Sequence, residues 1–416
     1  MSKGSRFNLL LKYQPFVPKP CFAVGVSGGA DSLALVFMAR DWAEEFGGRV
    51  VALIVDHGLR VESGAEAVRT ANLLSENNIE AHILRWEGVK PTHKLQEAAR
   101  EARYRLFDEW CIAKRVFYLL LAHHQEDQAE TFMLRLGSGV DGLSCMQEVT
   151  YRPFGLIIRP LLEQRPELMR EYLRKGGIVW IEDPSNQNPR FERVRWRGFL
   201  KDNAGLSLEI TKSAEKLQRV RATLEKETAN LLAGTLTISP LGFARLDALD
   251  LWSQAWEEIR RRALARIIGV LRRRSYSPSD YQLEKASLSL PEKSFSLGGF
   301  SFISKREHVL IVRENRDISQ ISITSARTIW DKRWEIITTN SVPDIYIAPL
   351  NNHPNSLPLV IRQTLPGIYD AQGLLAAPAI GFCREPHAQR FQTKFLPGIA
   401  LDNGFCLFPR YKRLSI

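Results

Sequence analysis

The chain has 416 residues, which is too long for one ordinary hydrophobic core and predicts two or three domains. It carries 57 Lys and Arg residues against 46 Asp and Glu residues, a formal net charge of +11 at pH 7. A positive excess of this size favours a polyanionic partner, either a nucleic acid or an anionic membrane surface.

The apolar runs are too short to cross a membrane or to form a signal peptide. Val51–Val55 and Val116–Leu121 have the length of strands, and Leu9–Leu11 is too brief for a signal. We therefore expect a soluble, cytoplasmic protein with no membrane partner. The cysteines are odd in number and form no Cys-x-x-Cys pair, so neither a disulfide framework nor a zinc knuckle is indicated. They are Cys21, Cys111, Cys145, Cys383 and Cys406.

The first 185 or so residues alternate β-branched runs with helical patterns. The strands are expected at Phe22–Val26, Val50–Val55, Ala81–Trp86, Val116–Leu121 and Ile178–Ile181. Helical patterns occupy Leu33–Phe46, Ala65–Asn77 and Leu95–Lys114. This rhythm predicts an α/β fold with a doubly wound parallel sheet, in which ligands bind at the carboxyl ends of the strands.

A glycine-rich turn follows the first strand and leads into a helix. It consists of Ser27, Gly28, Gly29, Ala30, Asp31 and Ser32. Glycines let the backbone approach a polyphosphate, and the N–H groups of the turn and the helix start point at the anion. The turn lacks the Lys-Ser/Thr pair of a Walker loop and the third glycine of a dinucleotide fingerprint. It resembles instead the SGGxDS loop of the PP-loop ATP pyrophosphatases, of the adenine nucleotide α-hydrolase-like fold, in which Asp31 would hold Mg²⁺ beside the phosphates.

Polar motifs also follow the second and fourth strands. Asp56, His57 and Gly58 follow the second strand, where they are expected to line a nucleotide pocket. A helix after the fourth strand places His123, Asp127, Glu130 and Thr131 on one face, a set suited to Mg²⁺ or an ammonium group. A zinc site is less favoured because the ligand spacing is wrong. The alternative is a solvated, self-paired helix N-terminus.

The rest of the chain divides at a cluster of turn formers, Asp183–Pro189. A basic helical region then runs from about Phe199 to Arg274 and contains Arg260-Arg261-Arg262 and Arg272-Arg273-Arg274. A small sheet is expected near Ser294–Glu314, and a compact β-containing tail from Pro343. The predicted domains are 1–198 (ATP-binding and catalytic), 199–316 (basic and helical) and 317–416 (small and C-terminal).

In order and spacing, the motifs resemble those of the tRNA(Ile)-lysidine synthetases. After the glycine loop and the Asp56–Arg60 segment, the matching phrases are Glu97–Tyr104, His123–Thr131, Gly137–Leu143, Arg159–Leu162, Trp180–Asn186 and, more weakly, Leu365–Gly373. The chain departs from the family where Val194 replaces an asparagine between two matching arginines, Arg193 and Arg197. The resemblance therefore assigns no role to an amide at position 194.

The resemblance implies an enzyme that joins free L-lysine to the wobble cytidine of an isoleucine tRNA with a CAU anticodon. ATP adenylates the C2 oxygen of the cytosine, and the lysine ε-amine displaces AMP. The glycine loop would hold pyrophosphate, and Asp31 with Asp127 would hold Mg²⁺. Glu130, with Asp127 and His123, would position lysine and help its amine to lose a proton. Arg103 and Arg193 would neutralise phosphate or adenylate charge, and Arg197 would be a further substrate contact. Domain 199–316 would bind the tRNA, and domain 317–416 would contribute to its recognition.

Three alternatives stay open. A tRNA thiolase of the same superfamily needs a reactive cysteine, often paired, which the spacing does not provide. A small-molecule amide or guanidine synthetase would not need the basic helical region. A catalytically idle RNA-binding protein would keep the loop only to sense a nucleotide. Whether the chain forms a homodimer, and which parts of the tRNA outside the anticodon it contacts, cannot be predicted from these residues.

Overall fold

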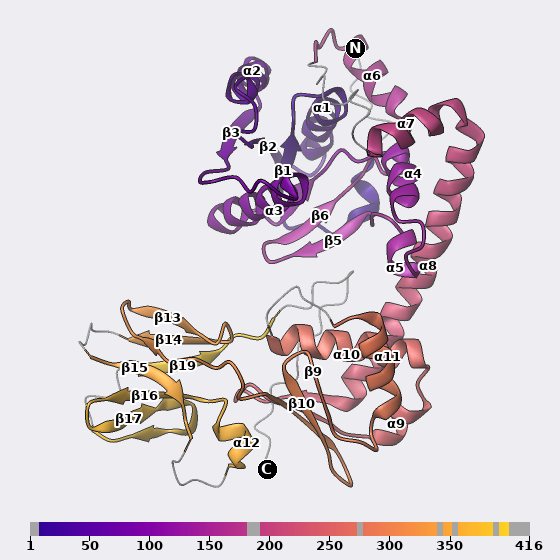
Figure 1. Ribbon diagram of the computed structural model, residues 1–416. Coiled ribbons are helices and arrows are strands. Elements are labelled where there is room, and N and C mark those ends of the chain that lie inside the picture. Colours follow the sequence, from indigo (N-terminus) through magenta and orange to yellow (C-terminus); the bar gives the residue numbers. More distant parts are fainter. Residues whose placement is uncertain are drawn as a thin grey trace. The chain divides into compact units, whose positions relative to one another are not determined.

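The structure is a computed structural model that describes residues 8–180, 192–272, 278–338, 344–351, 357–385 and 391–398. The chain divides into two compact units, and the division falls between Ala222 and Thr223, within the long helix α8 (Ala204–Thr235). Figure 1 labels many of the elements of both units. The predicted boundary at residue 198 lies within helix α7 (Glu192–Asp202), and the three-part division remains a prediction.

The first unit is built on a six-stranded sheet with the order β3-β2-β1-β4-β6-β5. Five of these strands run parallel, and β5 pairs antiparallel with β6. The order reverses between β1 and β4, which is where open α/β sheets place their ligands. The strands are β1 (Cys21–Val26), β2 (Arg49–Asp56), β3 (Glu80–Arg85), β4 (Tyr118–Leu120), β5 (Val149–Arg152) and β6 (Gly155–Ile158).

Helices cover both faces of this sheet, because alternate side chains of each strand are buried on opposite sides. Phe22 and Val24 of β1 share a core with α1, α2 and α6, whereas Ala23 packs with Phe107 and Cys111 of α3. The helices are α1 (Ala30–Glu44), α2 (Ser63–Glu76), α3 (Leu95–Lys114), α4 (Gln125–Leu134), α5 (Val140–Leu143) and α6 (Pro166–Lys175). The predicted doubly wound α/β fold is confirmed.

One predicted strand, Ile178–Ile181, is wrong over the residues that the structure describes. Residues 178–180 belong to no helix or strand. Val179 is 80% exposed, so its β-branched side chain does not pack on the sheet. Ile181 and the turn cluster Asp183–Pro189 lie outside the described residues.

The sheet is completed instead by the β5–β6 hairpin, which the strand pattern did not predict. Gly155 begins β6 with φ +149°, and a Cβ there would lie 2.3 Å from the carbonyl oxygen of Phe117. Only glycine permits this close approach of two backbones. The short hairpin therefore depends on a backbone contact that leaves no hydrophobic signature in the sequence.

The helical part of the second unit packs on an antiparallel sheet with the order β7-β8-β11-β10-β9. Gly298 and Gly299, both with positive φ, form the turn between β9 and β10, so the sheet expected near Ser294–Glu314 is confirmed. The elements are β7 (Leu236–Ile238), β8 (Ala244–Leu246), α9 (Leu249–Gln254), α10 (Glu257–Arg272), α11 (Asp280–Ser289), β9 (Phe295–Leu297), β10 (Phe300–Ser304) and β11 (Val309–Arg313).

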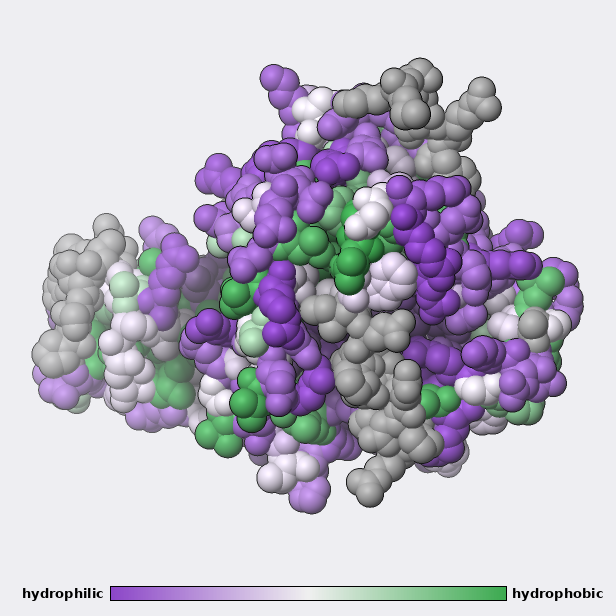
Figure 2. All heavy atoms as spheres, turned by 90° about the horizontal axis from the view of Figure 1, so that it is seen from above, coloured by the Kyte–Doolittle hydropathy of each residue, from purple (hydrophilic) through white to green (hydrophobic). Residues whose placement is uncertain are grey.

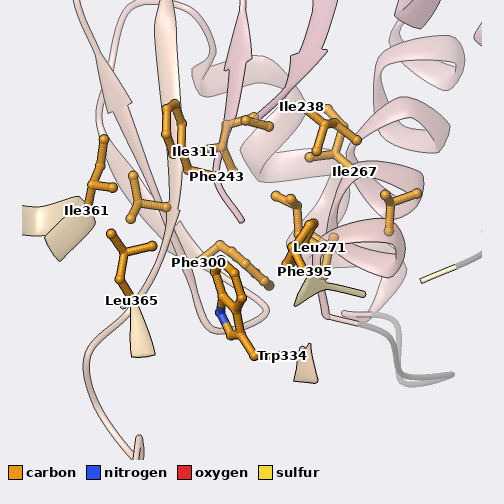
Figure 3. Close-up of a cluster of buried hydrophobic side chains, with 14 of the residues drawn as sticks. Ile238, Phe243, Ile267, Leu271, Phe300, Ile311, Trp334, Ile361, Leu365 and Phe395 are labelled. Atoms are coloured by element: carbon orange, nitrogen blue, oxygen red, sulfur yellow. The ribbon is translucent and has the colours of Figure 1, made fainter. Parts of the chain in front are cut away.

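The tail of the second unit contains two further antiparallel sheets, with the orders β12-β15-β16-β17-β18 and β13-β14-β19. Its core is continuous with that of the helical part: Ile267 of α10, Phe300, Trp334 and Phe395 belong to one buried cluster (Figure 3). The elements are β12 (Ile321–Ser322), β13 (Arg327–Trp330), β14 (Trp334–Thr338), β15 (Tyr346–Pro349), α12 (Leu359–Arg362), β16 (Pro366–Asp370), β17 (Gly373–Ala377), β18 (Phe382–Cys383) and β19 (Phe391–Phe395).

Hydrophilic side chains predominate on the face of the molecule in Figure 2, with hydrophobic ones between them. Among the described residues, no helix combines the length and the apolar character that a membrane span requires.

Candidate active site

The glycine loop is held in shape by its two serines. The backbone N–H of Ser27 donates to Ser32 Oγ at 3.0 Å, and Ser32 Oγ donates to the carbonyl oxygen of Gly29, also at 3.0 Å. Gly28 has φ +84°, and Gly29 is the N-cap of α1 without a side-chain cap. The N–H groups of the first turn of α1 therefore remain available to an anion.

The turn after β2 lies next to this loop, because β1 and β2 are parallel neighbours. Asp56 Oδ1 accepts hydrogen bonds from the Gly58 N–H (2.9 Å) and from Ser63 Oγ (2.8 Å). Burial raises the pKa of Asp56, but these hydrogen bonds outweigh burial and lower it overall. Asp56 thus stabilises the turn that presents His57 and Gly58.

The two histidines after β4 face different partners. His124 Nε2 lies 3.6 Å from Asp31 Oδ2 and 3.5 Å from Asp127 Oδ2, so it links the glycine loop to α4. Burial lowers the pKa of His124, but Asp31 and Asp127 outweigh burial and raise it. His123 instead meets Arg159, whose Nε donates to His123 Nδ1 at 3.2 Å. Sequence reasoning chose His123 and missed His124, although side chains alternate in an extended segment and His124 has extended backbone.

Two arginines of α7 meet the carboxylates of α4. Arg193 donates from Nη2 to Asp127 Oδ1 at 2.7 Å and from Nε to Glu130. Arg197 Nε donates to Glu130 Oε1 at 2.6 Å. Glu130 is fully buried, and Asp127 also accepts the backbone N–H of His124 as a helix cap. The pairing with α7 goes beyond a self-paired helix terminus, since the partners lie 63 to 67 residues apart in the chain.

Further arginines near this cluster have no carboxylate partner among the described residues. Neither Arg103 nor Arg159 takes part in an ion pair among the described residues, and Arg103 Nε is buried without an acceptor. Arg100 and Arg103 lie over the Tyr104 ring at 5.2 and 5.5 Å. Burial raises the pKa of Tyr104, but Arg159, Arg100 and Arg103 outweigh burial and lower it. An anion entering this region would meet unneutralised guanidinium groups.

Comparison with known proteins connects this geometry to one family. A PP-loop domain model matches residues 4–204. The tRNA(Ile)-lysidine synthase of Wolbachia pipientis is 35% identical over 343 residues, covering 79% of this chain and 79% of that protein. Those of Ruegeria pomeroyi (29% identity, 88% and 90% coverage) and Hyphomonas neptunium (35% identity, 70% and 81% coverage) are also similar.

The chain belongs to the tRNA(Ile)-lysidine synthase family. It is accordingly a ligase-type enzyme with a nucleotide-binding PP-loop domain. The predicted family is confirmed, whereas the roles of individual site residues remain predictions.

Asp31 of this lysidine synthase family member has an environment that suits a magnesium ion shared with a nucleotide. Within the described ranges, no group of three His, Cys, Asp or Glu side chains could hold a metal ion alone. Mg²⁺ beside a nucleotide needs only one or two carboxylates, with phosphates and water supplying the remaining ligands. Asp31 Oδ1 is buried and has no hydrogen-bond partner, which suits a metal ligand, and His124 links Asp31 to Asp127.

The described cysteines of the first unit do not have the character of sulfur-transfer nucleophiles. Burial raises the pKa of Cys111 to about 12 and that of Cys145 to about 11, and it also raises the pKa of Cys21. A reactive thiolate requires a lowered pKa. This observation disfavours the thiolase alternative for these three thiols.

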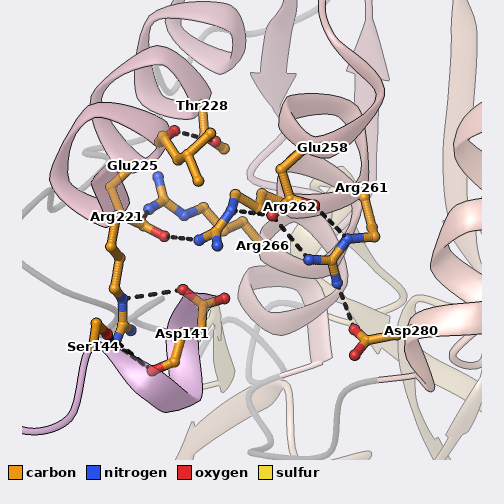
Figure 4. A network of polar contacts seen from close by, with 11 residues as sticks. Asp141, Ser144, Arg221, Glu225, Thr228, Glu258, Arg261, Arg262, Arg266 and Asp280 are labelled. Atoms are coloured by element: carbon orange, nitrogen blue, oxygen red, sulfur yellow. Dashed lines mark hydrogen bonds and ion pairs between the residues drawn. The ribbon is translucent and has the colours of Figure 1, made fainter. Parts of the chain in front are cut away.

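Within the run Arg260-Arg261-Arg262, considered as a tRNA-docking feature, Arg261 and Arg262 form ion pairs inside the second unit (Figure 4). Arg262 is buried and donates to Glu225 and Glu258, both at 2.6 Å. Arg261 pairs with Glu258 and Asp280. Of the second run, Arg272 donates to the Gly298 carbonyl oxygen at 3.1 Å, and Arg273 and Arg274 lie outside the described residues. Arg261 and Arg262 therefore stabilise the packing of α8, α10 and α11.

Proposed function

We propose that this protein joins L-lysine to C2 of the wobble cytidine of tRNA(Ile) with a CAU anticodon, forming lysidine through an adenylated tRNA intermediate. ATP is consumed, and AMP and pyrophosphate are released. The observation that carries the proposal is the cluster of Asp127, Glu130, Arg193 and Arg197, which His124 connects to the glycine loop through Asp31.

The nucleotide half of the reaction is assigned to the strand ends of the parallel sheet. Ser27, Gly28, Gly29, Ala30 and Ser32 hold the pyrophosphate portion of ATP through backbone N–H groups and hydroxyls. The backbone around Asp56, His57 and Gly58 lines the adenosine pocket. When bound by Asp31 and Asp127, Mg²⁺ would supply charge neutralisation at the phosphates.

The lysine half is assigned to α4. Asp127 and Glu130 supply the negative charge that attracts the ammonium form of the lysine side chain. Only the neutral amine is a nucleophile, so the amine has to lose a proton before it attacks C2. Because both carboxylates are paired with Arg193 in the present structure, lysine binding requires a rearrangement of these ion pairs.

Binding of the tRNA is assigned to arginines of the site and to the second unit. Arg103, Arg193 and Arg197 neutralise phosphate and adenylate charge near the cytidine. A base in a single-stranded anticodon loop leaves its stack at modest cost, which lets the cytidine enter the site. The second unit, in a chain with a net charge of +11, docks the tRNA body through phosphates.

Product formation measured with ATP, tRNA and lysine varied independently tests the function. The proposal predicts that pyrophosphate release needs ATP and tRNA, whereas AMP release also needs lysine. A catalytically idle RNA-binding protein would release neither product. Pyrophosphate release with a small-molecule acceptor in place of tRNA would contradict the proposal.

A further inference from the structure

Arg159 determines which nitrogen of His123 carries a proton. A guanidinium group has N–H donors and no acceptor. Because Arg159 Nε lies 3.2 Å from His123 Nδ1 and donates to it, Nδ1 must present its lone pair. A neutral imidazole with an unprotonated Nδ1 carries its proton on Nε2. A doubly protonated ring would place one N–H against another, so the contact also requires the neutral ring.

Arg159 is itself held firmly. It follows strand β6, its backbone N–H donates to the Glu148 carbonyl oxygen at 2.8 Å, and the residue is 5% exposed. Its Nη1 donates to the carbonyl oxygen of Gln147 (2.6 Å) and to Thr150 Oγ1 (2.9 Å). The backbone hydrogen bond holds the residue in place and the two Nη1 hydrogen bonds orient the guanidinium toward His123, so that moving it would leave a buried cation without these two acceptors.

The charges around His123 act in the same direction. Burial lowers its pKa well below the ordinary value, and the positive charges of Arg159, Arg103, Arg100 and Arg193 lower it further. These groups come from α3, from the end of β6 and from α7, so no single element creates the effect. The neutral form of His123 is thus favoured by the hydrogen bond and by the surrounding field.

We propose that Arg159 is a positioning residue that holds His123 as the neutral Nε2–H tautomer. In the reaction proposed above, on which this role rests, His123 then acts as a hydrogen-bond donor to a negatively charged substrate oxygen and not as the acceptor of the lysine proton. One ring nitrogen is occupied by Arg159 and the other already carries hydrogen. This assignment removes His123 from the set of candidate bases.

Nitrogen NMR of the full-length protein labelled with ¹⁵N-histidine tests the tautomer without reference to activity. The His123 signals are identified by their loss in His123→Gln. The expected spectrum is that of the Nε2–H tautomer, unchanged from about pH 5.5 to about pH 8.5, across the usual titration range of histidine. Arg159→Met should allow His123 to exchange tautomers and to titrate. An Nδ1–H signal or ordinary titration in the unaltered protein overturns the proposal, whatever the folding of the variant.

Two substitutions of His123 distinguish a role as hydrogen-bond donor from a role as proton acceptor. The amide nitrogen of His123→Gln reaches the place of Nε2, whereas that of His123→Asn reaches only the place of Nδ1. A donor role predicts that kcat falls less than about tenfold in the first variant and about a hundredfold or more in the second. Equal losses contradict the donor role. If the tautomer is confirmed but no lysine is joined to tRNA, the proposed function fails instead.

Discussion

Asp31 and Glu130 illustrate how residues of similar chemistry acquire different environments in this site. Asp31 keeps one buried oxygen without a hydrogen-bond partner, whereas Glu130 is fully buried between Arg193 and Arg197. Asp31 is therefore suited to binding a metal ion beside the phosphates. Glu130 is suited to holding the two guanidinium groups in position. Their substitutions should therefore affect different steps.

Asp31→Ala should abolish most adenylation, because it removes the proposed Mg²⁺ ligand beside the phosphates. We expect a loss of about 3 kcal/mol or more of transition-state stabilisation, roughly a hundredfold in rate. Pyrophosphate release in the presence of tRNA measures it. Asp41→Ala, on the same helix α1 but bonded to Tyr172, is the matched control. Adenylation at the unaltered rate in Asp31→Ala would remove Asp31 from the metal site.

Glu130→Gln should separate the two half-reactions. Adenylate formation is expected to persist, while the KM for lysine rises about tenfold or more, since one attractive charge for the ammonium is removed. Glu126→Gln, one turn earlier on α4 and in none of the ion pairs with Arg193 and Arg197, is the control. An equal loss in both half-reactions would place Glu130 at the nucleotide instead of at lysine.

At the scale of the elements, local patterns were informative and distant pairings were not. Helix α3 was predicted with the bounds that it has, Leu95–Lys114, because its amphipathic pattern is local. The β5–β6 hairpin was missed because Gly155 is required by its close approach to Phe117, which precedes β4. Likewise, residue type singled out Glu130 and Arg193, but their pairing depends on how α7 packs on α4. His123 and His124 differ only in which side of an extended segment each occupies.

The arginines of α10 provide a stability prediction for one element. Arg262→Met removes one of the two arginines that pair with the buried Glu225 carboxylate, while Arg266 remains, and should lower the free energy of unfolding by about 1 to 3 kcal/mol. Arg261→Met is the matched control, because Arg261 pairs with the exposed Asp280 and the partly exposed Glu258, so we expect less than about 1 kcal/mol. Urea denaturation measures both. Similar effects of the two substitutions would contradict the structural role of Arg262.

At the scale of the whole molecule, the net charge of +11 predicts salt-dependent binding of tRNA. The slope of log affinity against log salt is negative. Replacing Arg272, Arg273 and Arg274 with Ala should reduce its magnitude by about one for each phosphate that is no longer neutralised. Arg272→Ala alone controls for removal of the hydrogen bond to Gly298. An unchanged slope and affinity would show that these arginines form a solvated face.

The transfer of labelled lysine to tRNA tests the central claim most directly. The purified protein is incubated with ATP, labelled L-lysine and one of two tRNAs that share the CAU anticodon, tRNA(Ile) or tRNA(Met). The proposed function predicts ATP-dependent label at the wobble cytidine of tRNA(Ile) and none on tRNA(Met). Absence of label from tRNA(Ile), or label at another nucleotide, would contradict it.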